Sequence, residues 1–312
     1  MGAGSKSRRN SRTSPHHGVG MAIAHHGELL QGVFEDENGR LHRGLVTLPL
    51  PCKTARANFQ PAASRVITVH ARGKTKAVTA ARLTLDHLGI AAGGALEIDS
   101  DIPVGHGYGS STADVVATIR AVAAAYSQPL APPRIARIAV DAEQASDAIA
   151  FDDQAVLFAQ REGIVLEDFG GALPPMLVVG CKANGGLPID TLKLSPARYD
   201  GQEIQQFRVL RGLVAHAIRH QDPICLGRAA TASAWISQRR LPKQHLEQAM
   251  AIAQSAGACG IQVAHSGSLV GILFDVADKD VSQRSRRAAA TLQTAGFVDV
   301  EICPTHRGGA AW

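Results

Sequence analysis

The stretch Pro103–Ala113 (PVGHGYGSSTA) decides how the rest of this chain is interpreted. It follows a predicted strand over residues 95–102 and leads into a strongly apolar helical pattern over residues 113–126. Its three alternating glycines allow positive φ angles and a close approach of a ligand to the backbone. The first N–H groups of the following helix, together with the helix dipole, favour an anion. The stretch therefore predicts a loop that holds an oligophosphate.

Two familiar phosphate-binding motifs do not fit this loop. A Walker A loop ends in Gly-Lys-Ser/Thr, and no lysine stands here. A dinucleotide-binding G-x-G-x-x-G motif requires glycine at the position of Ser110. A glycine-rich turn capped by Ser110 or Ser111 is the structural alternative. The candidate cofactor-binding residues are Pro103, Gly105, Gly107, Tyr108, Gly109, Ser110, Ser111 and Thr112.

Composition describes a folded protein with a nearly neutral body. Hydrophobic residues make up 45% of the 312 residues and charged residues 19%, which excludes global disorder. The net charge is +5, but Lys6, Arg8, Arg9 and Arg12 place most of it in residues 1–18. We therefore predict a disordered basic tail over 1–18 and no nucleic-acid partner. No apolar run approaches the ~18 residues of a membrane span, so we expect no membrane partner.

The five cysteines are scattered, odd in number and lack a C-x-x-C pair. We interpret them as buried thiols in a reducing compartment. The N-terminus has no apolar segment typical of a secretion signal, so we predict a cytoplasmic location.

Periodicity and turn residues predict an α+β protein in two parts. We predict further strands at 21–34 (in two pieces around a glycine bend), 45–50, 65–70, 163–166, 176–181, 261–265, 269–275 and 297–303. We predict further helices at 74–88, 133–144, 152–161, 203–220, 225–238, 244–256 and 280–295. Glycine and proline pairs around residues 170–175 place a domain boundary between 19–171 and 172–312.

Two motifs far apart in the chain resemble one family. The stretch Pro103–Ala113 resembles the P-x-x-x-G-x-G-S-S-[TA]-A motif of the GHMP kinases. Gly257–Gly271 (GACGIQVAHSGSLVG) resembles that family's C-terminal glycine-rich motif, with a departure at Leu269, where the family often has glycine. The resemblance implies an N-terminal domain like ribosomal protein S5 domain 2, a ferredoxin-like C-terminal domain, and ATP between them.

A third motif narrows the resemblance. His25–Gly32 (HHGELLQG) is similar to the G-E-L-x-Q-G segment of the L-threonine kinase branch, as are parts of 143–163 and 185–191. The similarity covers roughly residues 20–303 and implies an enzyme that uses ATP and Mg²⁺ to phosphorylate a small hydroxy amino acid, with L-threonine first. The alternatives are a homoserine kinase or another GHMP small-molecule kinase, and a non-catalytic nucleotide-binding regulator. A homodimer is also possible for such a fold.

The resemblance also suggests roles for single residues. It nominates Ser111 and Glu143 as the Mg²⁺-binding pair, with Ser111 also in the catalytic group, and Asp147 as the base, with Asp152 as the fallback. The plain alternatives are a solvated helix-end acid for Glu143 and a helix N-cap for Asp147. No lysine stands within Gly27–Gly32 to lower the pKa of an aspartate. The candidate substrate-binding residues are Glu28, Gln31, Asp190, Thr191, Ser266 and Gly267.

Overall fold

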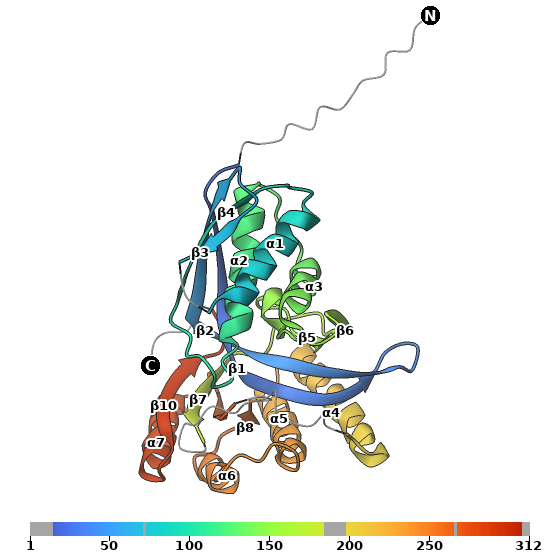
Figure 1. Ribbon diagram of the computed structural model, residues 1–312. Helices are drawn as coiled ribbons and strands as arrows, with labels where there is room; N and C mark the ends of the chain where they lie inside the picture. The colour runs from blue at the N-terminus through green and yellow to red at the C-terminus, as the bar shows by residue number, and fades with distance from the viewer. Residues whose placement is uncertain (1–14, 71–72, 184–197, 265–266, 308–312) are drawn as a thin grey trace, which may run out of the picture.

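The computed structural model describes residues 15–70, 73–183, 198–264 and 267–307 (Figure 1). Its strands form one long, curved sheet with the order β10-β7-β9-β8-β1-β2-β4-β3. The strands are β1 (Gly18–Glu35), β2 (Leu41–Ala62), β3 (Ile67–Val69), β4 (Gly93–Ser100), β5 (Val156–Ala159), β6 (Ile164–Asp168), β7 (Met176–Lys182), β8 (Gly260–Val263), β9 (Leu269–Asp275) and β10 (Val298–Pro304).

Strands β1 and β2 form the antiparallel hairpin that joins the two ends of the sheet. β1 pairs with β8 through Glu28 and Val263, and β2 pairs with β4 along its second half. The register of the hairpin shifts around residues 23–30, where Gly27 has a φ of +66°. These bulges bend β1 where it passes between the two parts of the molecule.

Seven helices cover this sheet within the described residues. They are α1 (Thr75–His87), α2 (Ser110–Ala125), α3 (Pro132–Glu143), α4 (Gly201–His220), α5 (Pro223–Gln238), α6 (Leu246–Ser255) and α7 (Val281–Thr294), with a short 3₁₀ turn η1 at Ala148–Phe151. Helices α1 and α2 lie beside β1–β4, α3 packs on α1 and α2, and α6 and α7 lie beside β7–β10 (Figure 1).

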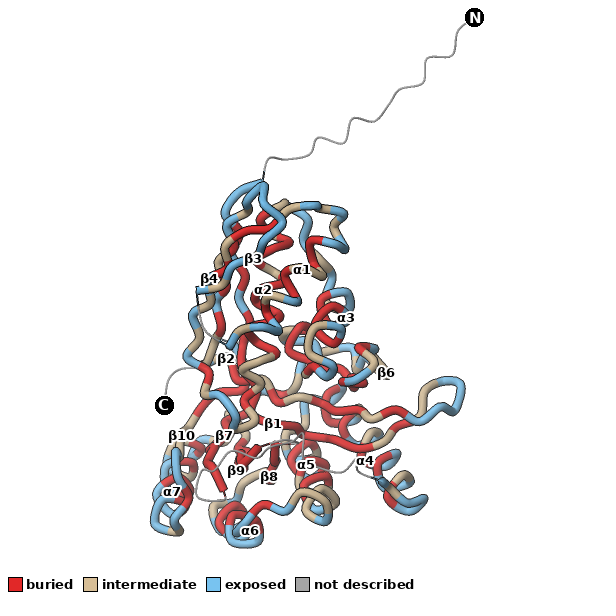
Figure 2. The backbone as a smooth tube through the Cα atoms, in the orientation of Figure 1, coloured by how far each residue is buried: buried red, intermediate tan, exposed pale blue. Residues whose placement is uncertain are grey.

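Small residues let α2 pack closely on the sheet. A Cβ atom built on Gly18 or Gly20 of β1 would lie 2.1 Å from the carbonyl oxygens of Ala121 and Ala117, respectively. The core around α2 is therefore made by close backbone contact and aliphatic side chains, which is how a chain with 4% aromatic residues buries its interior. Figure 2 shows the buried backbone continuing from α2 into β1 and β2.

The buried residues form two clusters that do not follow the predicted domain boundary. The larger contains the α2 helix and also Met176, Phe207 and Leu226 from the C-terminal part. The smaller lies between β7–β10 and helices α6 and α7. The sheet is continuous, and the larger core contains residues from both sides of residue 171. The division into two domains at that residue therefore stays a prediction.

The predicted elements agree with the structure except at four places. The strand predicted over 45–50 is part of the much longer β2, Leu41–Ala62. The predicted helix at 152–161 is wrong, because this segment contains the buried strand β5, whose short apolar run has no periodicity to separate a strand from a helix. The two pieces predicted over 21–34 are one bulged strand. Helix α2 begins at Ser110, three residues before the predicted start, so the hydroxyl residues belong to its first turn.

Other expectations fall at the ends of the chain and on the surface. Most of the predicted tail lies outside the described residues, but Gly18 begins β1 and the N–H of His16 donates to the carbonyl of Ala125 at 3.0 Å. All five cysteines are free thiols, but the expected burial holds only for Cys181 and Cys303, because Cys225 and Cys259 are half-buried and Cys52 is exposed. No helix in the described ranges is both long and apolar enough to span a bilayer.

Candidate active site

The glycine loop, residues 103–109, turns the chain from β4 into α2. Gly105, Gly107 and Gly109 have φ angles of +85°, +100° and +71°. Gly109 occupies the N-cap position in the left-handed conformation, and no side chain caps the helix. The first N–H groups of α2 therefore point out of the helix with the positive end of its dipole behind them. This part of the site has the geometry that an oligophosphate requires.

The carboxylate of Glu143 lies against the first turn of α2. The hydroxyls of Ser111 and Thr112 donate to its two oxygens at 2.8 Å each. The Lys76 ammonium lies 3.6 Å from the same carboxylate. Burial raises the pKa of Glu143, the two hydroxyls lower it, and the nearby charge of Asp147 raises it further. A carboxylate and a hydroxyl beside a phosphate-binding helix end are oxygen donors of the kind that Mg²⁺ prefers.

The side chain of Asp147 reaches the same place from the loop after α3. Its Oδ2 lies 3.4 Å from the hydroxyl of Thr112, which in turn bonds Glu143. The neighbouring backbone is anchored on both sides, because the N–H of Ser146 donates to the carbonyl of Gln160 and that of Ala148 to the hydroxyl of Thr47. The two carboxylates of the site therefore both lie against the hydroxyl of Thr112, which donates its proton to Glu143.

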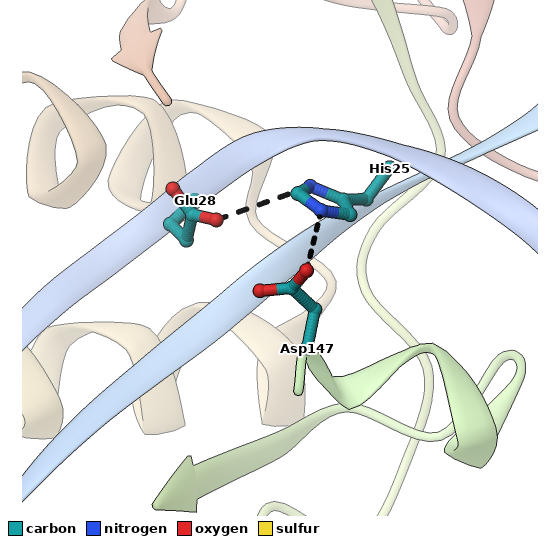
Figure 3. Close-up of side chains that lie close together, drawn as sticks. All are labelled: His25, Glu28 and Asp147. Carbon is teal, nitrogen blue, oxygen red and sulfur yellow. Dashed lines mark hydrogen bonds and ion pairs between the residues drawn. The ribbon is translucent and has the colours of Figure 1, made fainter. Parts of the chain in front are cut away.

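Asp147 also belongs to an acid–imidazole cluster with His25 and Glu28 (Figure 3). His25 Nε2 lies 3.0 Å from Asp147 Oδ2, and His25 Nδ1 lies 3.9 Å from Glu28 Oε1. The N–H of Gly27 points at Nδ1 from 3.1 Å, so Nε2 carries a proton toward Asp147 in the neutral ring as well as in the charged one. Burial lowers the pKa of His25, but the carboxylates of Asp147 and Glu28 outweigh burial and raise it to about 9.

The imidazole of His25 fits only because residue 109 is glycine. A Cβ atom on Gly109 would lie 2.2 Å from the His25 ring. The N–H of His25 also donates to the carbonyl of Tyr108 at 3.1 Å. β1 and the glycine loop therefore hold each other in place, and Asp147 is positioned by contact with both.

The second glycine-rich motif supports the glycine loop from the C-terminal part. Ser268 N–H donates to the carbonyl of His106 at 3.1 Å. Gly267, with a φ of +103°, lies so close that an added Cβ atom would be 2.2 Å from the same carbonyl oxygen. The two motifs that carry the family resemblance are thus in direct contact.

Replacing Gly267 with alanine should therefore destabilise the protein and disturb the glycine loop. We expect its cost in unfolding free energy, from urea denaturation, to exceed that of Gly39→Ala by about 1–3 kcal/mol. Gly39 is a matched control, because its φ is +76° but no atom lies within 4 Å of an added Cβ. Equal costs for the two variants would contradict the contact with His106.

The structure gives the other predicted residues different surroundings. The phenol of Tyr108 is buried and donates to Glu301 at 2.8 Å, so Tyr108 offers a ligand of the glycine loop only its backbone. Gln31 donates from its side-chain amide to Ser237 of α5 at 3.2 Å. Asp152, the fallback base, is held by two bonds from Arg120 and one from Arg307. Asp190, Thr191 and Ser266 lie outside the described residues.

Sequence reasoning missed two groups near the site. His25 takes the place beside Asp147 where we looked for a lysine, and its only sign in the sequence is the pair His25-His26 before Gly27-Glu28. Lys243 is buried, with 1% of its surface exposed, and donates to the carbonyl of Gly267 at 2.7 Å. Nothing in the local sequence around Lys243 indicates burial.

Comparison with known proteins agrees with this geometry. The profile of the GHMP kinases N terminal domain matches residues 75–160, and that of the GHMP kinases C terminal matches 214–292. L-threonine kinases from Citrobacter freundii and Salmonella typhimurium are 31% and 30% identical over 60% and 62% of this chain. The matched region spans 64% of each relative's own length, a little under two thirds.

Solved structures show the same fold over nearly the whole chain. A homoserine kinase from Cytophaga hutchinsonii has a TM-score of 0.71 at 14% identity, with 97% of both chains covered. A structure described as MDDEF in complex with MVAPP, AMPPCP and magnesium has a TM-score of 0.64 at 15% identity, covering 93% of this chain and 96% of that one. Since the two family profiles together take in just over half of the residues, in the order and places where the glycine-rich motifs stand, the chain belongs to the GHMP kinase family.

Proposed function

We propose that this protein is an ATP-dependent kinase that phosphorylates the side-chain hydroxyl of a small hydroxy amino acid, with L-threonine as the first candidate. The observation that carries the proposal is that the carboxylates of Glu143 and Asp147 both lie within 3.4 Å of the Thr112 hydroxyl, at the N-terminus of α2. This arrangement supports roles for Glu143 as the metal-binding carboxylate and for Asp147 as the base beside the glycine loop. The curated relatives named L-threonine kinase support the choice of acceptor.

The residues present fit ATP and Mg²⁺. The cradle is built on glycines, one of which, Gly109, has no room for a side chain, and the donor set of Ser111 and Glu143 consists of oxygens. The loop N–H groups of 107–111 would hold the phosphates, and Ser111 and Glu143 would hold the metal ion. Bound Mg²⁺ supplies neutralisation of the charge on the transferring phosphoryl group.

The remaining chemistry falls to Asp147 and His25. Phosphoryl transfer needs the acceptor hydroxyl to be positioned and relieved of its proton, and a carboxylate can do both. His25 donates to Asp147 and, when charged, keeps that carboxylate ionised. His25 thus acts as a positioning residue, in the role for which we had looked for a lysine.

The proposal is tested by phosphate transfer with the full chain, Mg²⁺ and ATP over an acceptor panel. L-threonine, L-serine and L-homoserine represent hydroxy amino acids, and mevalonate represents other acceptors. Product identified by phosphorus NMR should be O-phospho-L-threonine. A preference for homoserine or mevalonate would replace L-threonine as the proposed acceptor. ATP binding with no turnover on any compound would favour the alternative of a non-catalytic nucleotide-binding regulator.

The charge on His25 predicts a pH dependence of stability. Its pKa is about 9 in the folded protein and about 6.5 in an ordinary unfolded chain. The raised value means that the stabilisation is fully present below about pH 6.5 and is lost as the pH rises through about 9. We expect the difference in unfolding free energy between wild type and His25→Gln to shrink over this window by at most about 3 kcal/mol. Urea titrations at several pH values measure it, and a constant difference would contradict the ion pairs.

A further inference from the structure

A buried lysine ammonium lies beside the candidate active site without a role in the chemistry above. Lys243 stands between α5 and α6, where its N–H donates to the Gln238 side chain at 2.8 Å and its carbonyl accepts from that side chain at 2.9 Å. Its Nζ donates to the carbonyl of Gly267 at 2.7 Å. An ammonium has three N–H donors, and the Gly267 carbonyl is the one hydrogen-bond acceptor of Lys243 Nζ among the described residues.

The turn that Lys243 reaches is the one packed on Glu28. Glu28 pairs with Val263 across β1 and β8, and the Cβ of an added side chain on Gly27 would lie 2.7 Å from the Cα of Ala264. The N–H of Ala264 donates to the carbonyl of Leu269 and closes the turn that contains Gly267. Since Gly267 also touches His106, the carbonyl that Lys243 bonds belongs to a residue in contact with the glycine loop.

The Lys243 ammonium and the Glu28 carboxylate lie close enough to affect each other's charge state. Burial lowers the pKa of Lys243 to about 8 and the carboxylate of Glu28 raises it, so the side chain is charged at neutral pH. The Lys243 ammonium thus acts on the carboxylate of Glu28, which also lies 3.9 Å from His25 Nδ1. A buried charge without a partner is costly. An acceptor that carries both a carboxylate and an ammonium group offers Lys243 and Glu28 each a partner of opposite charge.

We propose that Lys243 binds the carboxylate of the acceptor amino acid and that Glu28 binds its ammonium group, so that the site selects zwitterions. This inference rests on the proposed function and deepens it by naming the groups that recognise the acceptor. A charge-assisted hydrogen bond contributes about 1.5–3 kcal/mol, so an acceptor that lacks one charged group should lose roughly 10- to 150-fold in kcat/KM.

The test compares three acceptors that share the hydroxyl. L-threonine carries both charged groups, isopropanolamine lacks the carboxylate, and β-hydroxybutyrate lacks the ammonium. We expect wild type to prefer L-threonine over each by roughly 10- to 150-fold. In Lys243→Met the preference over isopropanolamine should fall to about threefold or less, whereas the preference over β-hydroxybutyrate should fall in Glu28→Gln.

The ratio of kcat/KM for two acceptors, measured with the same protein preparation, separates a loss of recognition from damage to the fold. If Lys243 only anchors the Gly267 turn, Lys243→Met will lower turnover of L-threonine and isopropanolamine by the same factor, which would overturn the inference. Lys182→Met is the matched control, because Lys182 is also largely buried but pairs with Asp299 on β10. Its acceptor ratios should equal those of wild type.

Calorimetric titration of L-threonine into the protein without ATP keeps the inference testable if no turnover is found. L-threonine binding that is roughly 10- to 150-fold weaker in Lys243→Met than in wild type would support binding of the acceptor by Lys243, even if the proposed kinase activity failed. L-threonine binding that is equal in the two proteins, or absent from wild type, would overturn the proposed roles of Lys243 and Glu28.

Discussion

Asp147→Asn is expected to reduce kcat by about 10²- to 10⁴-fold while the KM for ATP changes by less than about threefold. Asparagine keeps the size of the side chain and an oxygen that accepts from His25, but it carries no charge and accepts no proton. The loss therefore falls on the chemical step and leaves the glycine loop in place. Steady-state kinetics with L-threonine, or with the preferred acceptor of the panel, measure it.

Asp152→Asn is the matched control for this substitution. Asp152 accepts hydrogen bonds from Arg120 at 2.7 and 3.2 Å and from Arg307 at 2.9 Å. We expect its kcat to stay within about threefold of wild type, with a loss of stability from the broken ion pairs. The opposite pattern, a large loss in Asp152→Asn and a small one in Asp147→Asn, would reverse the assignment of the base.

The sequence was informative where a short segment determines its own conformation. The glycines before Ser110 and the apolar periodicity after it predict a loop and a helix, and both are present. Ser111 and Glu143 are 32 positions apart, and only the family resemblance joined them before the structure showed a 2.8 Å contact. The motifs of a family indicate such contacts between distant residues, whereas the hydrophobic periodicity of one segment does not.

The features that were missed depend on contacts between distant segments. His25 approaches Asp147 across 122 positions, and the fit depends on a glycine in a third segment, Gly109. Strand β5 was taken for a helix because four buried apolar residues suit either structure until β2 and β6 supply hydrogen-bonding partners. Burial of Lys243 follows from how the α5–α6 connection packs on the Gly267 turn, and polar side chains give no local sign of such packing.

The substitution Glu143→Gln is expected to lower kcat/KM for ATP by about 10²- to 10³-fold, equivalent to ~3–4 kcal/mol of transition-state stabilisation. The amide keeps the size of the side chain but removes the negative charge that accepts from Ser111 and Thr112. Titration of Mn²⁺ in the presence of ATP, followed by electron paramagnetic resonance, should show weaker metal binding by the variant. This readout does not depend on turnover.

Glu167→Gln serves as the control, because Glu167 is a partly exposed carboxylate on β6 that pairs with Arg211. Its metal binding and kcat/KM should match wild type. Burial and the nearby charge of Asp147 raise the pKa of Glu143. As the pH falls, Glu143 should therefore be protonated at a higher pH than an ordinary glutamate, and metal binding should weaken at that higher pH. If Glu143→Gln binds Mn²⁺ as tightly as wild type, the carboxylate is not a metal ligand, and its bonds to Ser111 and Thr112 serve only to fix the first turn of α2.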